Sequence, residues 1–499
     1  MEDFWSLVPC PVNFLYIVSE ILASYFEKEF EKMKVPYYNI HMRTKMFEKD
    51  IFVFFVQKME GVERMNEIEE QIKKQAQFAE KLSWEKIPDD VRERAKWVIL
   101  DSLGCVIKGC SGIKQNEKKT KEKADRIIDI AGAMISTELY EGNRKAIGHP
   151  ACHIIPLLLV ESAHTEMTYE EFMRIFVAAY EVAARWGRSI RFSHDVLGHG
   201  TVMTSGAAVA EGLICGMDAG EIYETLLLTE SLPMVSVWQS VFDGSKLHDV
   251  YAGLSATMAI QSTRMMKRGV RSTGKIVLDV YQKIMGADAV PEQLGEGLGE
   301  EYLLMSNYFK VHTGCRFVHP FADVMQKEME AGLKKEDVEQ IHVYTYKKAA
   351  RLTDQTVPND LAAKFSIPVS LAVQLIYGSL TPDTIRNCEK NEAVQKLSEH
   401  IWLHEDEEYN KLLPDVRGGR VEITKKDGSK ITREVFHAVG DFDNPDAYTK
   451  DDLVRKFCEN TKTVFDTEQA EQFAGKILNP GNNEKMESIL KEFYSVIGG

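Results

Sequence analysis

Residues 91–106, Val-Arg-Glu-Arg-Ala-Lys-Trp-Val-Ile-Leu-Asp-Ser-Leu-Gly-Cys-Val, repeat apolar side chains at three- and four-residue spacing. This period places Val91, Ala95 and Val98 on one face of a helix, where they can bury against a core. The same period recurs in later segments as far as about residue 275. The pattern therefore predicts that the first half of the chain is an α-helical domain.

Helix starts in this half are marked by capping boxes, in which a Thr or Asp precedes a Glu by three residues. Thr168 precedes Glu171, and Asp218 precedes Glu221, each ahead of an apolar-periodic run. We place the helical domain at residues 65–275.

The pattern changes after the glycine-rich stretch Gly295–Gly299, which we interpret as a connection near a domain joint. Residues 341–346 alternate like a strand, and two alternating segments flank Asp427-Gly428 as in a β-hairpin. Because helical patterns lie between these strands, residues 276–440 are predicted to form an α+β lid domain. Residues 441–499 return to a helical pattern, and we expect them to rejoin the first domain.

Residues 1–64 differ from the rest because they are rich in aromatic residues, Lys and Glu and show no clear helical period. We predict a peripheral N-terminal extension here. An alternative is that translation starts at Met65, which opens a well-patterned helix. The apolar stretch 14–18 is interrupted by Glu20, so neither a signal peptide nor a membrane span is expected.

The bulk composition limits the partners that the protein can have. The 499-residue chain is 44% hydrophobic and carries a formal net charge of −15. An acidic surface disfavours nucleic acids and anionic membranes, so an anionic ligand needs a local basic pocket. The eight cysteines include no CxxC pair, so neither a metal-binding spacing nor a disulfide framework is indicated. We expect a globular protein in a reducing, cytoplasmic setting.

Four segments concentrate His, Lys and Arg among small residues, as an anion-binding pocket requires. They are Glu141–Pro150, Leu197–Ala208, Asp243–His248 and Tyr308–Pro320. Each has a plainer interpretation, because histidines often serve as turn, capping or core residues and most lysines are solvated. His149 and His153 stand four apart, as zinc ligands can, but no third ligand lies nearby in the sequence and no metal site is expected.

Taken in order, these four segments resemble the motifs of the MmgE/PrpD family. The likeness extends from about Met65 to the C-terminus and includes residues 97–104, 180–185 and 363–368. Members similar to this chain include 2-methylcitrate dehydratase, cis-aconitate decarboxylase and an iminodisuccinate epimerase. The resemblance implies a mainly α fold, with a large all-helical domain, a smaller α+β lid domain, a pocket between them and usually a homodimer.

The resemblance also implies the residues of the site. It assigns catalysis to His199, His149, Lys246 and Lys310, and substrate binding to Arg316, Glu141 and His319. The family's reactions pass through or near a carbanion beside a carboxylate, so cations must offset its charge. The two lysines are the natural cations, and the two histidines titrate in the range that allows proton transfer. No metal ion and no cofactor are expected.

The chain departs from the family pattern beside the predicted pocket. Tyr140, Glu141, Gly142 and Asn143 stand where members commonly show Asp-Asp-Gly-His. Val250 replaces a common glycine, and Val369 replaces a common tyrosine. These changes weaken the transfer of any one named substrate, and the missing tyrosine speaks against simple identity with the decarboxylases.

We therefore predict a lyase or isomerase that acts on a small polycarboxylic acid by moving a proton next to a carboxylate. Dehydration of a 2-methylcitrate-like acid is the leading reaction, and decarboxylation or epimerisation is the alternative. A non-catalytic carboxylate-binding or scaffold protein is the alternative from another class. The expected partners are the substrate and a second copy of the chain, with no nucleic acid and no membrane.

Overall fold

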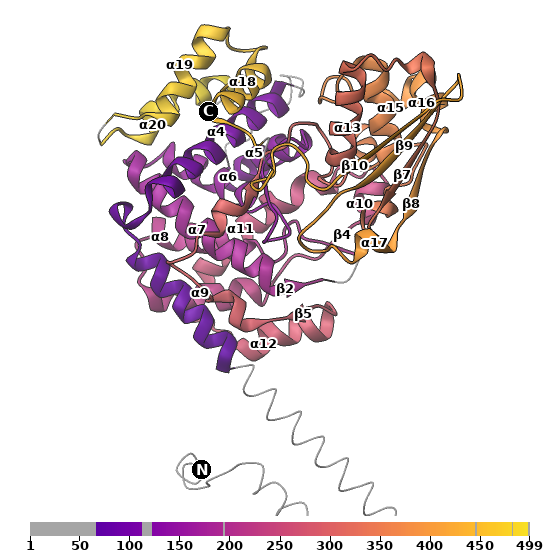
Figure 1. Cartoon of the computed structure of the whole chain (residues 1–499). Coiled ribbons are helices and arrows are strands. Elements are labelled where there is room, and N and C mark those ends of the chain that lie inside the picture. The colour runs from indigo at the N-terminus through magenta and orange to yellow at the C-terminus, as the bar shows by residue number, and fades with distance from the viewer. Residues whose placement is uncertain (1–65, 112–121, 193–194, 445–446, 482, 498–499) are drawn as a thin grey trace, which may run out of the picture. The chain divides into compact units, whose positions relative to one another are not determined.

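The computed structural model describes residues 66–111, 122–192, 195–444, 447–481 and 483–497 (Figure 1). The chain divides into two compact units, Met1–Glu70 and Gln71–Gly499. The helices, strands and cavity that concern function lie in the second unit. The predicted N-terminal extension, residues 1–64, lies outside the described residues. No helix in the described ranges is both long and apolar enough to cross a membrane.

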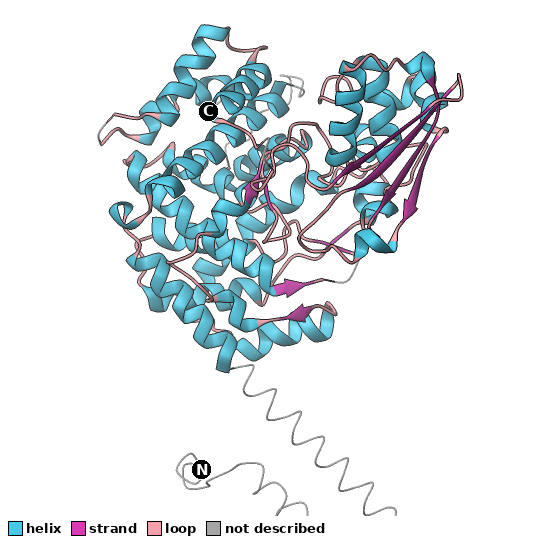
Figure 2. Ribbon diagram, in the orientation of Figure 1, coloured by secondary structure: helices cyan, strands magenta, loops and turns pink. Residues whose placement is uncertain are grey.

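Helices dominate the first part of the second unit, as the apolar period predicts (Figure 2). The larger ones are α4 (Asp89–Ser111), α5 (Lys123–Ser136), α6 (Ala151–Ser162), α7 (Tyr169–Ser189), α8 (Thr204–Ile214), α9 (Ala219–Glu230) and α11 (Leu247–Lys267). Asp218 and Glu221 form the predicted capping box of α9, and Thr168 caps α7 by accepting a hydrogen bond from the backbone of Glu171. The prediction of a mainly helical fold is confirmed.

Small side chains let α8 pack closely against two neighbouring helices. A Cβ added at Gly206 in α8 would lie 2.8 Å from the side chains of Ala183 in α7 and Ile154 in α6. Packed protein interiors hold few voids, so no larger residue fits there without displacing a neighbour. The small-residue run after His199 thus draws α8, and the loop before it, into the helical core.

A four-stranded sheet in the order β10-β9-β7-β8 forms the centre of the α+β part. Its strands are β7 (Val338–Thr345), β8 (Ile401–Glu405), β9 (Gly419–Lys425) and β10 (Lys430–Val435). The predicted hairpin is present, with Ile423 of β9 opposite Ile431 of β10. β7 runs antiparallel to β9 and parallel to β8. Alternate residues such as Ile341 and Val343 face a core that also contains Phe321.

The helices of this part differ in detail from the sequence pattern, which predicts helices at 316–331 and 362–377. They are α13 (His319–Glu330), α14 (Asp360–Lys364), α15 (Ile367–Tyr377) and α16 (Glu392–Ser398). α13 begins only at His319, so Arg316 lies in the segment before it. The second predicted helix breaks between α14 and α15, because Ser366 caps α15 and Pro368 occupies its first turn. A proline there cannot continue the preceding helix.

Short strand pairs join segments that are far apart in the sequence. β1 (Gly142–Asn143) pairs antiparallel with β6 (Asn307–Tyr308), and β3 (Val196–Leu197) pairs with β4 (Ser236–Val237). The first pair places the segment after α5 beside the segment that leads to Lys310. Local sequence patterns do not predict such pairings, because each strand has only two residues.

The C-terminal helices pack against the helical part, although they follow the α+β part in the sequence (Figure 1). α18 (Lys450–Thr461), α19 (Thr467–Leu478) and α21 (Lys491–Ile497) all contact α4. Thr449 and Asp452 form the predicted capping box of α18. The division of the chain into a helical domain, a lid and returning helices stays a prediction.

Candidate active site

A cavity of about 340 Å³ is lined by residues from the helical part and from the α+β part. Its charged and histidine side chains are Glu138, His149, His153, Arg191, His199, Lys310, Arg316, Lys348 and Arg417. Five cations and one carboxylate therefore line the cavity of a chain whose net charge is −15. The cavity is the local basic pocket that an anionic ligand of an acidic protein requires.

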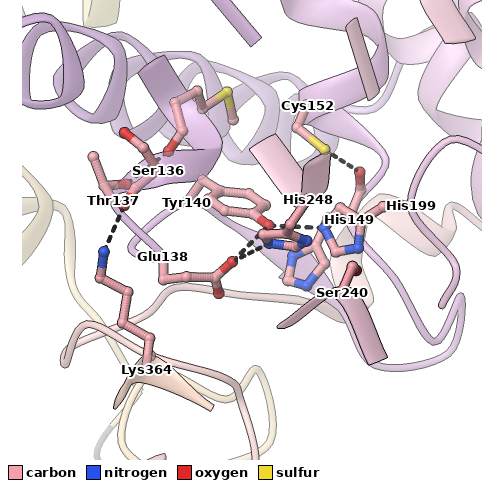
Figure 3. Close-up of polar contacts among 12 residues, drawn as sticks. Ser136, Thr137, Glu138, Tyr140, His149, Cys152, His199, Ser240, His248 and Lys364 are labelled. Atoms are coloured by element: carbon pink, nitrogen blue, oxygen red, sulfur yellow. Dashed lines mark hydrogen bonds and ion pairs between the residues drawn. The ribbon is translucent and has the colours of Figure 1, made fainter. Parts of the chain in front are cut away.

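Glu138 connects a lysine and a histidine at this site. Figure 3 shows the Glu138 carboxylate beside His248, with Tyr140 close by. Its Oε2 accepts a hydrogen bond from Nζ of Lys310 at 2.6 Å, and its Oε1 accepts one from Nε2 of His248 at 2.9 Å. Burial alone would raise the pKa of Glu138, but Lys310 and His248 hold that pKa well below its ordinary value. Glu138 is thus an ionised carboxylate that stabilises the buried Lys310 ammonium beside the cavity.

The backbone of Glu138 adopts the left-handed conformation, with φ of 50°. Residues other than glycine rarely adopt it, and such strain persists where the surrounding structure holds it in place. Here the amide of Gly314 donates to the Glu138 carbonyl at 3.1 Å. The strained backbone indicates that the orientation of the Glu138 side chain toward Lys310 and His248 is important for this site.

His149 has one ring nitrogen fixed by the backbone and one without a partner. Its Nδ1 donates to the carbonyl of Glu141 at 2.7 Å, since a carbonyl can only accept. The lone pair therefore lies on Nε2, which receives no hydrogen bond from the described part of the chain. Burial, aided by the charge of Lys310, lowers the pKa of His149 to about 3. A neutral imidazole with a free lone pair on the cavity wall is able to accept a proton.

His199 lies beside His149 and is held by a tyrosine. The two imidazole rings stack with centroids 5.1 Å apart. The hydroxyl of Tyr140 lies 2.8 Å from Nε2 of His199 and 3.3 Å from Oε1 of Glu138. This hydroxyl has one proton, so it donates either to His199 or to Glu138, and in the second case Nε2–H of His199 donates to it. Burial holds the pKa of His199 well below its ordinary value, so this ring is also neutral.

Three further cations lie where the α+β part lines the cavity. Arg316 pairs with the buried Asp441, while its Nη1 is buried without a hydrogen-bond partner in the described residues. No carboxylate of the described chain pairs with Lys348 or Arg417, and burial lowers the pKa of both. The carboxylates of a bound ligand would offset these charges.

The structure brings together four of the seven site residues that the sequence predicts. His149, His199, Lys310 and Arg316 line the cavity, whereas Lys246, Glu141 and His319 do not. The roles of all seven in catalysis and binding stay predictions, and the other three lie outside the cavity lining, where they were not expected.

Lys246 is exposed and precedes the first residue of α11. His248, two positions later, is fully buried and reaches Glu138. Residues two apart on a helix do not share a face, so only one of the two can point inward. The prediction that Lys246 supplies a pocket cation does not agree with this position.

Glu141 holds other residues of the site in place through hydrogen bonds. Its Oε1 accepts from the amide of Ala151, the first residue of α6, at 2.9 Å, and its Oε2 accepts from the hydroxyl of Tyr180 at 3.0 Å. Burial raises the pKa of Glu141 to about 8. Its carbonyl orients His149, so Glu141 positions a site residue, and its own side chain does not line the cavity.

His319 is the first residue of α13 and is 1% exposed. Burial, and then the charge of Arg316, hold its pKa well below the ordinary value. His319 does not line the cavity, and its predicted role in substrate binding stays a prediction.

Four residues that build the site were not assigned to it from the sequence. Glu138 lies in a segment without a motif, and Arg417 precedes β9 in a loop that looks solvent-facing in the sequence. His248 stood inside one of the four segments, but the choice between it and Lys246 depends on where α11 begins. Tyr140 was noted only as a departure from the family pattern.

His153 is not available as a metal ligand beside His149. Its Nδ1 donates to the His149 carbonyl at 3.0 Å, and its Nε2 accepts from the amide of Gly200 at 2.8 Å. Both nitrogens are thus engaged by the backbone. His153 instead ties the loop before α6 to the loop before α8.

Within the described ranges, His437, Asp441 and Asp443 lie close enough together to hold an ion. Asp443 accepts a hydrogen bond from Arg144 at 2.7 Å, and Asp441 pairs with Arg316. The two arginines already balance the two carboxylates, which disfavours a divalent cation there.

The geometry defines the class of protein, which is a mainly helical protein with a basic cavity that contains neutral histidines beside buried cations. A model of the MmgE/PrpD N-terminal domain matches residues 129–283, and a model of the MmgE/PrpD C-terminal domain matches residues 312–479. The chain belongs to the MmgE/PrpD family.

Two relatives carry the same name. Cis-aconitate decarboxylase of Aspergillus terreus (strain NIH 2624 / FGSC A1156) is 23% identical over 414 residues, which are 73% of this chain and 84% of that protein. A second cis-aconitate decarboxylase of Aspergillus terreus is 23% identical over 415 residues, with the same coverage.

Proposed function

We propose that the protein is a lyase that acts on a small di- or tricarboxylic acid by moving a proton on the carbon next to a carboxylate. The observation that carries this proposal is the neutral His149, whose free Nε2 belongs to the wall of a cavity that also contains Lys310 and Arg316. The similarity to cis-aconitate decarboxylase over 73% of the chain supports the lyase class.

The cavity supplies what such a proton transfer needs. A hydrogen next to a carboxylate is a weak acid, because the carbanion places a second negative charge beside the first. Lys310 and Arg316 would stabilise that charge by binding the substrate's carboxylates. An entering carboxylate would also raise the pKa of His149 from about 3, so the imidazole becomes a stronger base in the complex.

Dehydration of a 2-methylcitrate-like hydroxy acid is the leading reaction. Nε2 of His149 takes the proton from the carbon, the electron pair forms the new double bond, and the hydroxyl group leaves with a proton as water. The Lys310 ammonium and the newly protonated His149 each carry a proton that the hydroxyl could take. His199, held by Tyr140, is the second candidate for the acid or base.

Decarboxylation of a cis-aconitate-type acid is the second candidate, favoured by the two relatives of that name. The electron pair released with carbon dioxide would shift through the double bond, and one proton would be added to carbon. The same cations would bind the remaining carboxylates, and a protonated histidine would deliver the proton.

Proton exchange tests both reactions. The purified protein would be incubated in D₂O with 2-methylcitrate, citrate, cis-aconitate and dicarboxylates, and NMR would follow loss of C–H signals and new products. We expect deuterium incorporation or product with wild type, a loss of about 10²- to 10⁴-fold with His149→Gln, and no loss with the matched surface variant His164→Gln.

Other outcomes would contradict the proposal. Silence across the panel from folded protein would overturn it. If citrate then raised the Tm of wild type and Lys310→Ala equally, the non-catalytic alternative would be favoured, since the cavity cation would not matter. Normal turnover by His149→Gln would remove His149 from the assigned role.

We also propose that residues 65–275 and 441–499 act as the helical domain, that residues 276–440 act as a lid, and that the protein is a homodimer. Light scattering after size-exclusion chromatography checks the assembly, and a monomer at micromolar concentration would contradict it. The buried free thiols of Cys105, Cys152 and Cys315 support a reducing, cytoplasmic setting.

A further inference from the structure

The cavity wall also contains an apolar surface formed by aromatic and aliphatic side chains. Trp238, Phe317 and Phe365 line it together, and Phe192, Val202 and Met203 extend it. The rings of Trp238 and Phe317 stack with centroids 6.1 Å apart and planes at 18°, and Phe365 meets Trp238 edge-on at 6.2 Å. We call Trp238, Phe317 and Phe365 the aromatic wall.

The apolar surface begins beside the reacting groups. The ring of Phe365 meets the ring of His248 edge-on at 5.4 Å, and His248 meets the ring of His199 edge-on at 4.9 Å. A Cβ added at Gly148, the residue before His149, would lie 2.1 Å from Cε of Met203. An apolar group attached near the reacting carbon would therefore reach this surface without leaving the cavity.

The cations of the cavity come from several segments, and one of them, Arg316, directly precedes Phe317 of the aromatic wall. Lys310 and Arg316 lie before α13, Lys348 follows β7, and Arg417 precedes β9. The lining thus combines cations that suit carboxylates with aromatic and aliphatic side chains that suit an apolar group. A carboxylate gains nothing against an aromatic face, and water held there is released favourably by an apolar substituent.

We infer that the substrate is a di- or tricarboxylic acid that bears an alkyl or aryl substituent of several carbons, which packs on the aromatic wall. The inference rests on the proposed function and narrows its substrate class. A methyl group covers little of this surface, whereas a longer chain buries more apolar area with each carbon. Selectivity for the longer acid then comes from the substituent, and reactivity comes from the carboxylate end.

A series of citrates that carry methyl, ethyl, butyl or hexyl groups tests the inference with the intact protein. We expect kcat/KM to rise about fourfold with each added methylene until the wall is covered. In Phe317→Ala the factor by which kcat/KM rises with each added methylene should fall toward one. Leu413→Trp fills the cavity from a partly exposed lining position, so it should shorten the longest alkyl chain that the enzyme accepts. The exposed control Val464→Ala should keep the wild-type series.

The outcomes separate this inference from the proposed function. If methyl and unsubstituted acids react and longer chains react no better, the inference is wrong and the lyase proposal stands. If every acid of the series is silent with folded protein, both are wrong. If Phe317→Ala fails to fold, the test is the longest alkyl chain that Leu413→Trp accepts. If that length is the same as in wild type, the inference is wrong.

Discussion

Glu138 and Lys310 should behave as one energetic unit, because each is the partner that keeps the other's charge stable in a buried site. The Oε2–Nζ distance is 2.6 Å, and the side chains are 2% and 0% exposed. At an effective dielectric constant of about 20 the attraction is about 6 kcal/mol, part of which offsets the desolvation of the two ions. Removing one partner should therefore cost about 3–5 kcal/mol of unfolding free energy.

Removing both charges should cost less than the sum of the single losses. Glu138→Gln leaves Lys310 without its carboxylate, and Lys310→Met leaves Glu138 with its hydrogen bond from His248 but without a lysine, whereas the double variant removes both charges. We predict a coupling energy of about 2–3 kcal/mol in the double-mutant cycle. Activity should be lost in all three variants, because the cation that faces the substrate is missing or displaced.

The pH dependence of the Lys310→Met variant follows from the same contact. In wild type the pKa of Glu138 lies below its ordinary value, so its contribution to stability is present above that ordinary value and is lost only at lower pH. Without Lys310, burial raises the pKa of Glu138, and the folded state takes up a proton as pH falls. The destabilisation caused by Lys310→Met should therefore shrink between pH 8 and pH 5.

Urea unfolding followed by far-UV circular dichroism measures this cycle for the four proteins at pH 8 and pH 5. The exposed pair Lys476–Glu492, which lies 2.8 Å apart, provides a control cycle that should show little coupling. Additive losses at Glu138 and Lys310, like those of the control pair, would refute the buried ion pair.

Four further predictions follow from the site. The pKa of Glu141 is raised to about 8 in the folded protein, so the unfolding free energy of wild type should fall as pH rises from 5 to 8. Glu141→Gln lacks this titration and should therefore gain stability relative to wild type over the same range in urea titrations. A constant difference between the two proteins would contradict the assignment. Tyr140→Phe should lower kcat about tenfold or more and shift its pH profile with little change in KM, since it releases His199; an unaltered profile would leave Tyr140 a packing role. Lys246→Ala should keep kcat/KM within about threefold of wild type, because Lys246 is exposed and does not line the cavity. A 100-fold loss in steady-state kinetics would show that this segment enters the site. Activity should survive dialysis against EDTA, and its loss with recovery on adding Zn²⁺ would contradict chemistry by side chains alone.

Much of the fold follows from local patterns in the sequence. The helical period of residues 91–106 is realised in α4, and the Asp427-Gly428 turn joins β9 to β10 as a hairpin. These features depend on side chains a few residues apart, so their physical cause is visible in one segment. The helix predicted at 362–377 failed in detail because Pro368 and the Ser366 cap stop one helix and start another.

Part of the candidate site was also predictable, because ordered motifs named His149, His199, Lys310 and Arg316 and all four line the cavity. The exposed position of Lys246, outside the cavity lining, could not be predicted from its segment. The sequence shows that a lysine and a histidine stand two apart, but only the start of α11 decides which of them points inward.

What the sequence by itself determined is the helical class, the hairpin, the family motifs and the need for a basic pocket in an acidic chain. Only the tertiary structure decided that Glu138 would meet both Lys310 and His248, or that Arg417 would face the cavity without a carboxylate partner in the described residues. Those contacts join residues 110 and 172 positions apart. These contacts form because distant segments pack together, through pairings such as β1 with β6. The local pattern of a segment does not show which distant side chain it will contact.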